Sequence, residues 1–366
     1  MDFSPSPSQQ LLVATARDFL RRHCPPETAQ RLALDERGFD EAFWRRMAEL
    51  GWPGLLVPGD FGGSDGSLLD VILLVEEMGR AALPGPFVAS AVVATSLLMA
   101  AGSAEQRARL LPGLAAGERI VTLALVEDGG SFDPGAISLQ CEVPGRLTGT
   151  KLFVNNAHVA SDLIVGLRGG DLLLLPADRR GIAQVPLDTL SGEKTFEVTF
   201  DRVEVRTQDR LGLPGCGAEA LAAALAAGAL ARTAEMVGAA QRVLDLAVEH
   251  AKTRVQGGRP IGAYQAIQHA CADLVRDVDT SRGLVYVAAW KASEGLPAGA
   301  EVATAKAYAG EACLTVARRG HQIFGAIGYC EEHPLHLLHK RIHAASLDFG
   351  DAGLHLETVA RDIGLR

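Results

Sequence analysis

The stretch AEALAAALAAGALARTAEMVGAAQRVLDLAVEHAKTRVQ, residues 218–256, decides how the rest of the chain is interpreted. It contains no proline, and only Gly228 and Gly238 interrupt a run rich in alanine and leucine. Such residues favour the helical conformation, so the run predicts one long helix over Ala218–Gln256. Three further helical stretches follow, at about Ala263–Ser293, Ala298–Phe324 and Pro334–Ile363. Together they predict an antiparallel four-helix bundle over residues 216–366.

The N-terminal third of the chain also carries helical spacing. QQLLVATARDFLRRHC (9–24) ends before two prolines, and FDEAFWRRMAELG (39–51) ends at Gly51, a favourable residue for leaving a helix. After the loop GWPGLLVPGDFGG (51–63), helical patterning returns in SLLDVILLVEEMGRAAL (67–83) and in Val88–Ala101. Residues 1–118 are therefore predicted to be all-helical.

The pattern between these two regions changes to short, β-rich segments separated by turn residues. The predicted strands are Ile120–Val126, Lys151–Asn155, Asp162–Val165, Leu172–Leu175 and FEVTFDRVEV at 196–205. In the last of these, Phe196, Val198 and Phe200 fall on one face. The sequence predicts a small antiparallel β domain over residues 119–215.

Composition narrows the classes of function. The chain has 366 residues and a net charge of −9, which disfavours nucleic acid as a partner. Its six cysteines form no C-x-x-C pair, which suits a reducing compartment. The N-terminus lacks the basic and apolar regions of a secretion signal, and no segment is expected to span a membrane, so we expect a cytoplasmic protein.

Three motifs at consistent spacing carry a family resemblance. They are GWPGLLVPGDFGG followed by LLDVILLVEEMGRA, KTRVQGGRPIGAYQAIQHACADL (252–274), and HQIFGAIGYCEEHPLHLLHKR (321–341). Over nearly the whole chain the sequence resembles the acyl-CoA dehydrogenase family. The resemblance implies an α+β multidomain fold, with a helical domain at 1–118, an antiparallel β-barrel domain at 119–215 and a four-helix bundle at 216–366.

The resemblance implies FAD as the cofactor and assigns residues to each part of it. Arg254 and Gln265 correspond to FAD-binding positions, and a permanently charged guanidinium suits a pyrophosphate. Gln322 and Gly325 correspond to positions that contact the ADP half of an FAD held by a neighbouring subunit.

The flavin-ring side departs further from the family pattern. VEDGGSFD (126–133) is a shortened form of the family's flavin-ring stretch. Phe153 and Asn155 stand where many members have tryptophan and threonine beside the flavin, so an aromatic face and a hydrogen-bonding side chain are retained.

The catalytic carboxylate of the family is missing. Acyl-CoA dehydrogenation needs a base for the α-proton while hydride leaves the β-carbon. The two positions that family members use for this glutamate fall on Phe349 and Gly228. Three acids nearby in the sequence are candidate substitutes: Asp348, Asp351 and Glu235.

A local pattern suggests how the chain could function without a base. GYCEEHPLHLLHKR (328–341) resembles subunits of heterotetrameric acyl-CoA dehydrogenases from steroid side-chain degradation, in which one chain carries the base and the other lends FAD contacts. The first hypothesis is therefore a cofactor-sharing subunit that acts with a related subunit on a CoA thioester, with steroid-derived thioesters as one candidate class. An electron-transfer flavoprotein is a candidate acceptor. The alternatives are a homomeric dehydrogenase that uses Asp348, Asp351 or Glu235 as base, and a flavin-dependent monooxygenase on the same fold.

Histidines at 336, 339 and 343 have a spacing that could place all three on one helix face. No carboxylate or fourth ligand accompanies them in the sequence. We therefore expect packing or an acyl contact, and no metal site.

Overall fold

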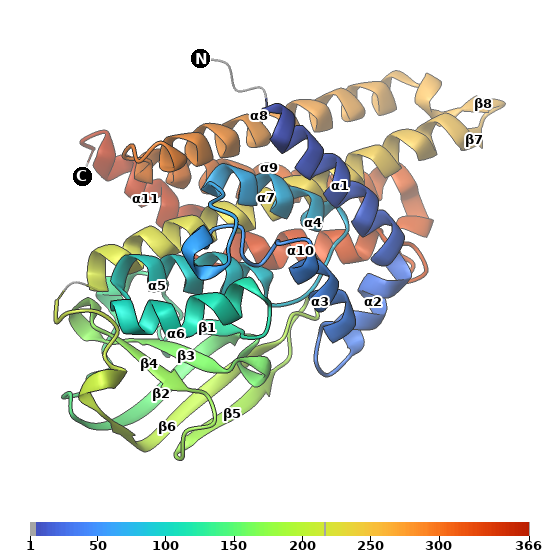
Figure 1. Ribbon diagram of the computed structural model, residues 1–366. Coiled ribbons are helices and arrows are strands. Elements are labelled where there is room, and N and C mark those ends of the chain that lie inside the picture. The colour runs from blue at the N-terminus through green and yellow to red at the C-terminus, as the bar shows by residue number, and fades with distance from the viewer. Residues whose placement is uncertain (1–4, 216, 366) are drawn as a thin grey trace. The chain divides into compact units, whose positions relative to one another are not determined.

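The structure is a computed structural model that describes residues 5–215 and 217–365. Along the chain, an N-terminal helical region is followed by a region of sheets and then by a C-terminal helical region (Figure 1). This order confirms the predicted α+β class.

Contacts along the backbone divide the described chain into two compact units. The bundle unit comprises the chain up to Arg31, Leu68–Leu83, and the chain from Ala229 onwards. The sheet unit comprises Leu32–Ser67 and Pro84–Gly228. The three-domain division at residues 118 and 215 stays a prediction.

The N-terminal helices begin and end at the signals present in the sequence. The helices are α1 (Pro7–His23), α2 (Pro26–Leu34), α3 (Glu41–Glu49), α4 (Leu68–Arg80), η2 (Val88–Ala94), α5 (Thr95–Ala101) and α6 (Ala104–Ala115). At the start of α1 the Ser6 hydroxyl accepts from the Gln9 amide, and the Gln9 side chain accepts from the Ser6 amide, a reciprocal capping box. Gly51, with φ +76°, follows α3 in the left-handed conformation, as predicted. The predicted helix at residues 88–101 forms, although its first half has the wider π-helical winding.

The middle region contains two three-stranded sheets. One has the order β1 (Val121–Ala124), β3 (Asp162–Gly166), β4 (Leu172–Pro176); the other has the order β2 (Gly145–Asn155), β6 (Thr195–Val205), β5 (Ile182–Leu187). The antiparallel prediction is wrong for one pair, because β1 and β3 run parallel. The long connection between them, which includes β2, gives the chain room to return in the same direction. Among the described residues the strands form no closed barrel, so the barrel stays a prediction.

A common apolar core holds residues of these sheets. Phe196, Val198 and Phe200 are all buried in it, which confirms that alternate residues of β6 share a face. Strand β5 was not predicted from the sequence, because its burial is only partial and Pro186 lies inside it.

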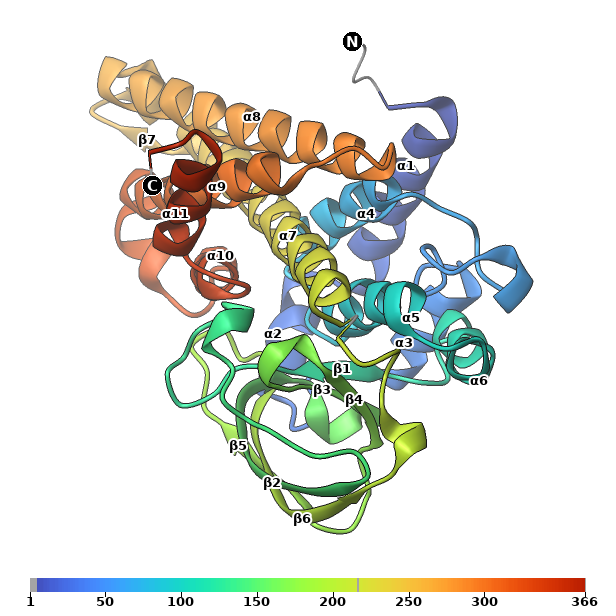
Figure 2. The same ribbon diagram turned by 90° about the vertical axis from the view of Figure 1, so that its left-hand side faces the viewer.

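The C-terminal helices match their predicted ranges closely. They are α7 (Gly217–Thr253), α8 (Gln265–Ser293) and α9 (Gly299–Phe324). A short hairpin, β7 (Val255–Gln256) and β8 (Arg259–Pro260), joins α7 to α8, and α8 packs against α9 (Figures 1 and 2). Helix α9 also packs against both helices that follow it.

The predicted last helix, Pro334–Ile363, is wrong in one respect, because it is two helices. These are α10 (Leu335–Leu347) and α11 (Ala352–Asp362). Asp348 leaves the helical conformation with ψ 139°, and Phe349 and Gly350 then take positive φ values of +57° and +99°. The break falls at the position where the family resemblance places the missing carboxylate.

Helix α7 is long and apolar enough to cross a membrane, by length and composition alone, and is the one such helix among the described residues. This corrects the expectation that no segment reaches that length. Of its most apolar 18-residue window, 78% is buried inside the protein.

Helices α4 and α7 approach so closely that only glycine fits at their contact. A Cβ atom at Gly238 of α7 would overlap the backbone carbonyl of Glu76 in α4, and one at Gly79 of α4 would overlap the carbonyl of Glu235. Backbone atoms cannot move aside as a flexible side chain can. The two glycines therefore set the spacing of these helices in the bundle unit.

We expect Gly238→Ala to destabilise the protein by about 3 kcal/mol or more, because the added methyl forces α4 and α7 apart. Gly283→Ala in α8 is the matched control, since a Cβ there meets nothing within 4 Å. That change is expected to stabilise the protein by up to about 1 kcal/mol through helix propensity. Thermal unfolding monitored by circular dichroism measures both. Equal melting temperatures for the two variants would contradict the close contact.

Candidate active site

The backbone at the position of the missing base is firmly held, although its side chain is apolar. Phe349 is buried, with 8% of its surface exposed. Its carbonyl oxygen accepts a hydrogen bond from Nε2 of His355 at 3.0 Å. On the preceding turn, the buried ammonium of Lys306 donates to the carbonyl oxygens of Ala345 at 2.7 Å and Ser346 at 2.8 Å. These bonds satisfy carbonyls that the end of α10 leaves without helical partners.

Burial lowers the pKa of Lys306 to about 7, with the nearby Arg232 acting in the same direction and the carboxylates of Asp348 and Asp351 acting against it. The charged form of Lys306 is therefore stabilised by its hydrogen bonds to the two carbonyls and by the nearby carboxylates of Asp348 and Asp351. Sequence reasoning did not identify this lysine, because lysine is almost never fully buried and nothing in its local sequence marks it as an exception.

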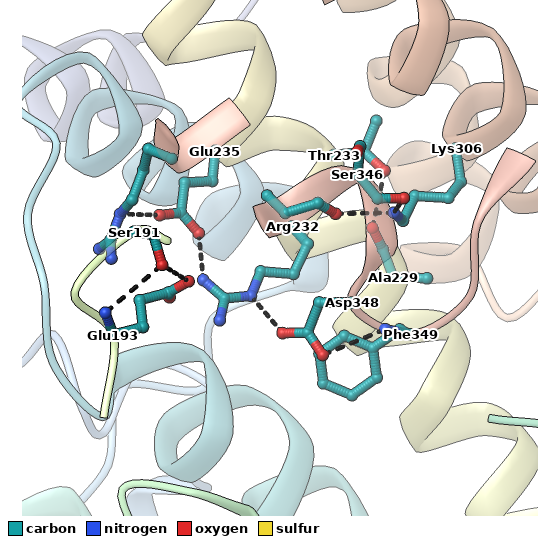
Figure 3. A network of polar contacts seen from close by, with 12 residues as sticks. Ser191, Glu193, Ala229, Arg232, Thr233, Glu235, Lys306, Ser346, Asp348 and Phe349 are labelled. Atoms are coloured by element: carbon teal, nitrogen blue, oxygen red, sulfur yellow. Dashed lines mark hydrogen bonds and ion pairs between the residues drawn. The ribbon is translucent and has the colours of Figure 1, made fainter. Parts of the chain in front are cut away.

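Two of the candidate acids belong to a buried network of ion pairs (Figure 3). Arg232 lies between them, with Nη1 at 2.6 Å from Oε2 of Glu235 and Nε at 2.8 Å from Oδ2 of Asp348. The other oxygen of Glu235, Oε1, lies 2.9 Å from Nε of Arg341. None of the four side chains is more than 15% exposed. Both acids thus face guanidinium groups, and a proton taken up by either would weaken a buried ion pair.

The third candidate acid has a structural role at a helix end. Asp351 is the N-cap of α11, and its Oδ1 accepts from the Leu354 amide at 2.9 Å. It is exposed to solvent. Gly228, the second position at which the family resemblance places a base, lies within α7 and has no side chain to contribute.

The cofactor-binding candidates of the bundle unit lie at one end of the bundle. Arg254 immediately follows α7, Gln265 is the first residue of α8, and the β7–β8 hairpin joins them. Gln322 and Gly325 lie at the end of α9, which reaches the same end of the bundle, because His250 near the end of α7 stacks on Phe324 with ring centroids 4.5 Å apart. The fold thus brings together residues separated by about 70 positions in the sequence.

The surfaces of these residues suit an anionic cofactor. Arg254, Gln265 and Gln322 are exposed. Gly325 has φ +66° and ψ −143°, a backbone conformation open to glycine, and a Cβ built there meets no atom within 4 Å. Its backbone can therefore be approached closely by a ligand. A guanidinium, two amides and an accessible backbone are donors that fit a pyrophosphate.

A cluster of histidines surrounds the end of α9. His321 stacks on Tyr329 and lies 4.9 Å from the ring of His339, while His333 contacts Phe324. Burial lowers the pKa of each of these three histidines and of His250. The ring contacts of His250, His321, His333 and His339 pack these side chains around the end of α9.

The flavin-side candidates lie together in the sheet unit. Phe153 has φ +53° at an irregularity of β2, and its side chain is 49% exposed. A left-handed conformation is rare for a bulky residue and holds this aromatic ring outward. The amide of Leu152 donates to the Val126 carbonyl at 2.8 Å, so the VEDGGSFD segment runs beside Phe153. Asn155 ends the same strand, and its carbonyl accepts from the Thr122 hydroxyl at 2.6 Å.

Glu127 anchors the VEDGGSFD segment. Its Oε1 accepts from the buried ammonium of Lys151 at 2.8 Å and from the Leu139 amide at 3.0 Å, and its Oε2 accepts from the Ser138 amide at 2.9 Å. Burial alone raises the pKa of Glu127, but these hydrogen bonds outweigh it and lower the pKa to about 2. The carboxylate therefore fixes the segment in place, a function that the sequence comparison of this segment did not predict.

Comparison with known proteins identifies the family. Residues 6–118 match the acyl-CoA dehydrogenase N-terminal domain, and residues 215–364 match the acyl-CoA dehydrogenase C-terminal domain. The chain is 31% identical to acyl-CoA dehydrogenase IpdE2 of Mycobacterium tuberculosis, over 94% of this chain and 93% of that protein.

Solved structures of similar fold support the same family assignment. The ChsE4–ChsE5 complex from Mycobacterium tuberculosis has a TM-score of 0.92 at 28% identity, with 100% of both chains covered. The Tcur3481–Tcur3483 steroid acyl-CoA dehydrogenase has a TM-score of 0.88 at 30% identity, with 98% of both chains covered. The chain belongs to the acyl-CoA dehydrogenase family, whose members are FAD-dependent enzymes acting on CH–CH groups of acyl-CoA thioesters.

We expect the protein to lose stability as the pH falls below about 6.5, the ordinary pKa of histidine. The folded-state pKa values of His250, His321, His333 and His339 lie below that of the unfolded chain. Between the two values the unfolded state binds more protons, so their stabilising contribution is present above pH 6.5 and is lost as the pH falls towards the folded values.

Urea unfolding at pH 7.5 and pH 5.5 measures this effect, with a lower midpoint expected at pH 5.5. His333→Asn should reduce the difference, whereas His269→Asn, at an exposed histidine outside the cluster, should not. A midpoint that stays constant with pH, or an equal response of both variants, would show that the cluster does not titrate with unfolding.

Proposed function

We propose that this chain is the cofactor-sharing subunit of a heteromeric acyl-CoA dehydrogenase, in which a related subunit supplies the catalytic base. The observation that carries the proposal is the state of the acids around Phe349. The family's base position has an apolar, buried side chain. Asp348 and Glu235 are held in buried ion pairs, and Asp351 caps a helix.

The chemistry of the reaction explains why acids held in ion pairs cannot replace the missing base. Removing the α-proton of a thioester needs a carboxylate within hydrogen-bonding reach of that proton. FAD, when bound, supplies the acceptor for the hydride that leaves the β-carbon. For Glu235 to act as base, it would have to give up contacts with two guanidinium groups, which leaves buried positive charge uncompensated. A separate subunit with an intact base avoids this cost.

The residues retained by this chain fit the complementary role. Arg254, Gln265, Gln322 and the backbone of Gly325 offer donors for the pyrophosphate and ADP half of FAD. Phe153 offers an exposed aromatic face, and Asn155 a side chain capable of hydrogen bonding. In the proposed assembly these residues bind and orient the cofactor, and the proton transfer takes place on the related subunit.

The relatives support a heteromeric assembly and a bulky substrate. The similar structures include the ChsE4–ChsE5 complex and the Tcur3481–Tcur3483 steroid acyl-CoA dehydrogenase. By this similarity we propose a CoA thioester of a steroid-derived acyl group as the substrate class. We propose an electron-transfer flavoprotein as the acceptor.

The proposal is tested by assaying the purified chain alone and together with a related acyl-CoA dehydrogenase chain from the same organism. Dye reduction with butanoyl-CoA, octanoyl-CoA and a steroid side-chain CoA thioester gives the readout. We expect reduction by the pair and none by this chain alone. Within the pair, Asp351→Asn in this chain is expected to leave the rate within about twofold, because the side chain caps an exposed helix.

A homomeric, yellow preparation of this chain with the full activity of the pair would refute the proposal. In that case, loss of the activity in Asp348→Asn or Glu235→Gln would identify the acid that acts as base. The melting temperatures of these variants distinguish a catalytic loss from a structural one, because only a structural loss lowers the melting temperature.

A further inference from the structure

A groove of about 560 Å³ lies in the bundle unit, and none of the residues assigned above to catalysis or cofactor binding lines it. Its walls come from α1, the segment that follows it, the end of α4, one position of α7 and the start of α10. The floor is apolar and includes Leu20, Ala29, Ala81, Leu337 and Leu338. Its size lies in the range of pockets that hold small organic molecules.

The lining of the groove includes four arginines, Arg17, Arg21, Arg80 and Arg242, and two acids, Asp18 and Glu77. Arg17 is bonded to Glu77 through two contacts, at 2.6 and 2.9 Å. Arg21 is paired with Asp18 at 2.7 Å. Both acids that line the groove are thus already paired with arginines of α1.

The other two arginines, Arg80 and Arg242, share one nearby carboxylate, that of Asp245. Arg80 is paired with Asp245, and the second oxygen of Asp245 accepts from the Gln241 side chain at 2.9 Å. Arg242 is half-buried and makes no hydrogen bond or ion pair with any residue that the structure describes. Burial, and next the like charge of Arg80, lower the pKa of Arg242, and the nearby carboxylate of Asp245 only partly opposes them. A partly desolvated guanidinium beside another guanidinium is stabilised by an added anion.

We propose that this groove binds a small organic carboxylate with an apolar body, of the fatty-acid class, with its carboxylate on Arg242 and its chain along Leu337, Leu338 and Leu20. A guanidinium can bond a carboxylate through two parallel hydrogen bonds. The leucine and alanine floor removes the chain from water. The site is separate from the thioester chemistry and does not depend on the proposed division between subunits.

Isothermal titration of the purified chain with octanoate and with octan-1-ol tests the site. The two probes share an apolar chain and differ in the charged group. We expect octanoate to bind about tenfold more tightly, a preference that Arg242→Gln abolishes while octan-1-ol binding stays unchanged. Arg45→Gln, which removes an exposed arginine of α3 outside the groove, is the matched control and should retain the preference.

A second variant tests the groove independently of whether Arg242→Gln folds. Leu337→Glu places a carboxylate in the groove and is expected to weaken octanoate binding at least fivefold with a normal circular dichroism spectrum. The proposal is overturned if octanoate does not bind the unaltered chain, if both probes bind equally, or if octanoate binds both groove variants as it binds the unaltered chain.

Discussion

The buried guanidinium of Arg232 organises the region around the family's catalytic position. It pairs with the buried carboxylate of Glu235 and with the carboxylate of Asp348, whose side chain is 15% exposed. It joins Glu235, one turn further along α7, to Asp348 at the end of α10, and Arg341 completes the set of two positive and two negative charges. Removing one member of such a network leaves an uncompensated charge away from water, which is far more costly than the pairs are stabilising. The fold thus holds both acids in contact with guanidinium groups.

A self-sufficient dehydrogenase needs both an ordered loop at the base position and a carboxylate on that loop. This chain has the ordered loop without the carboxylate. The loop between α10 and α11 keeps an ordered, left-handed turn at Phe349 and Gly350, fixed by His355 and by the carbonyls that Lys306 binds. The loop at the base position is therefore ordered, but the side chain of Phe349 cannot accept a proton. At the end of the bundle, by contrast, Arg254 and Gly325 retain features suited to a cofactor.

Much of the fold could be predicted from the sequence because its signals are local. The apolar run of α7, the left-handed stop at Gly51 and the alternation in β6 each depend on neighbouring residues. The break at Phe349 escaped prediction, although Gly350 is a local signal for a helix end and Asp351 for a helix start. The parallel pairing of β1 with β3 also depends on long-range packing, which residue patterns do not encode.

The candidate site divides in the same way. Motif spacing was sufficient to name Arg254, Gln265, Gln322 and Gly325, and the fold brings them to one end of the bundle. The ion-pair network was not predicted, although Arg232 and Glu235 stand out as charges three residues apart in an otherwise apolar stretch of α7. Their partners lie more than a hundred residues away, so only the folded chain could identify them.

The division of labour between two subunits is tested most directly by titrating FAD into this chain alone, into its related partner chain alone, and into an equimolar mixture, with flavin fluorescence as the readout. The account predicts saturable binding in the mixture, no tight binding by this chain alone, and about tenfold weaker binding when the mixture contains Arg254→Met. One tightly bound FAD for each copy of this chain alone, together with bleaching of that flavin by an acyl-CoA thioester, would contradict it.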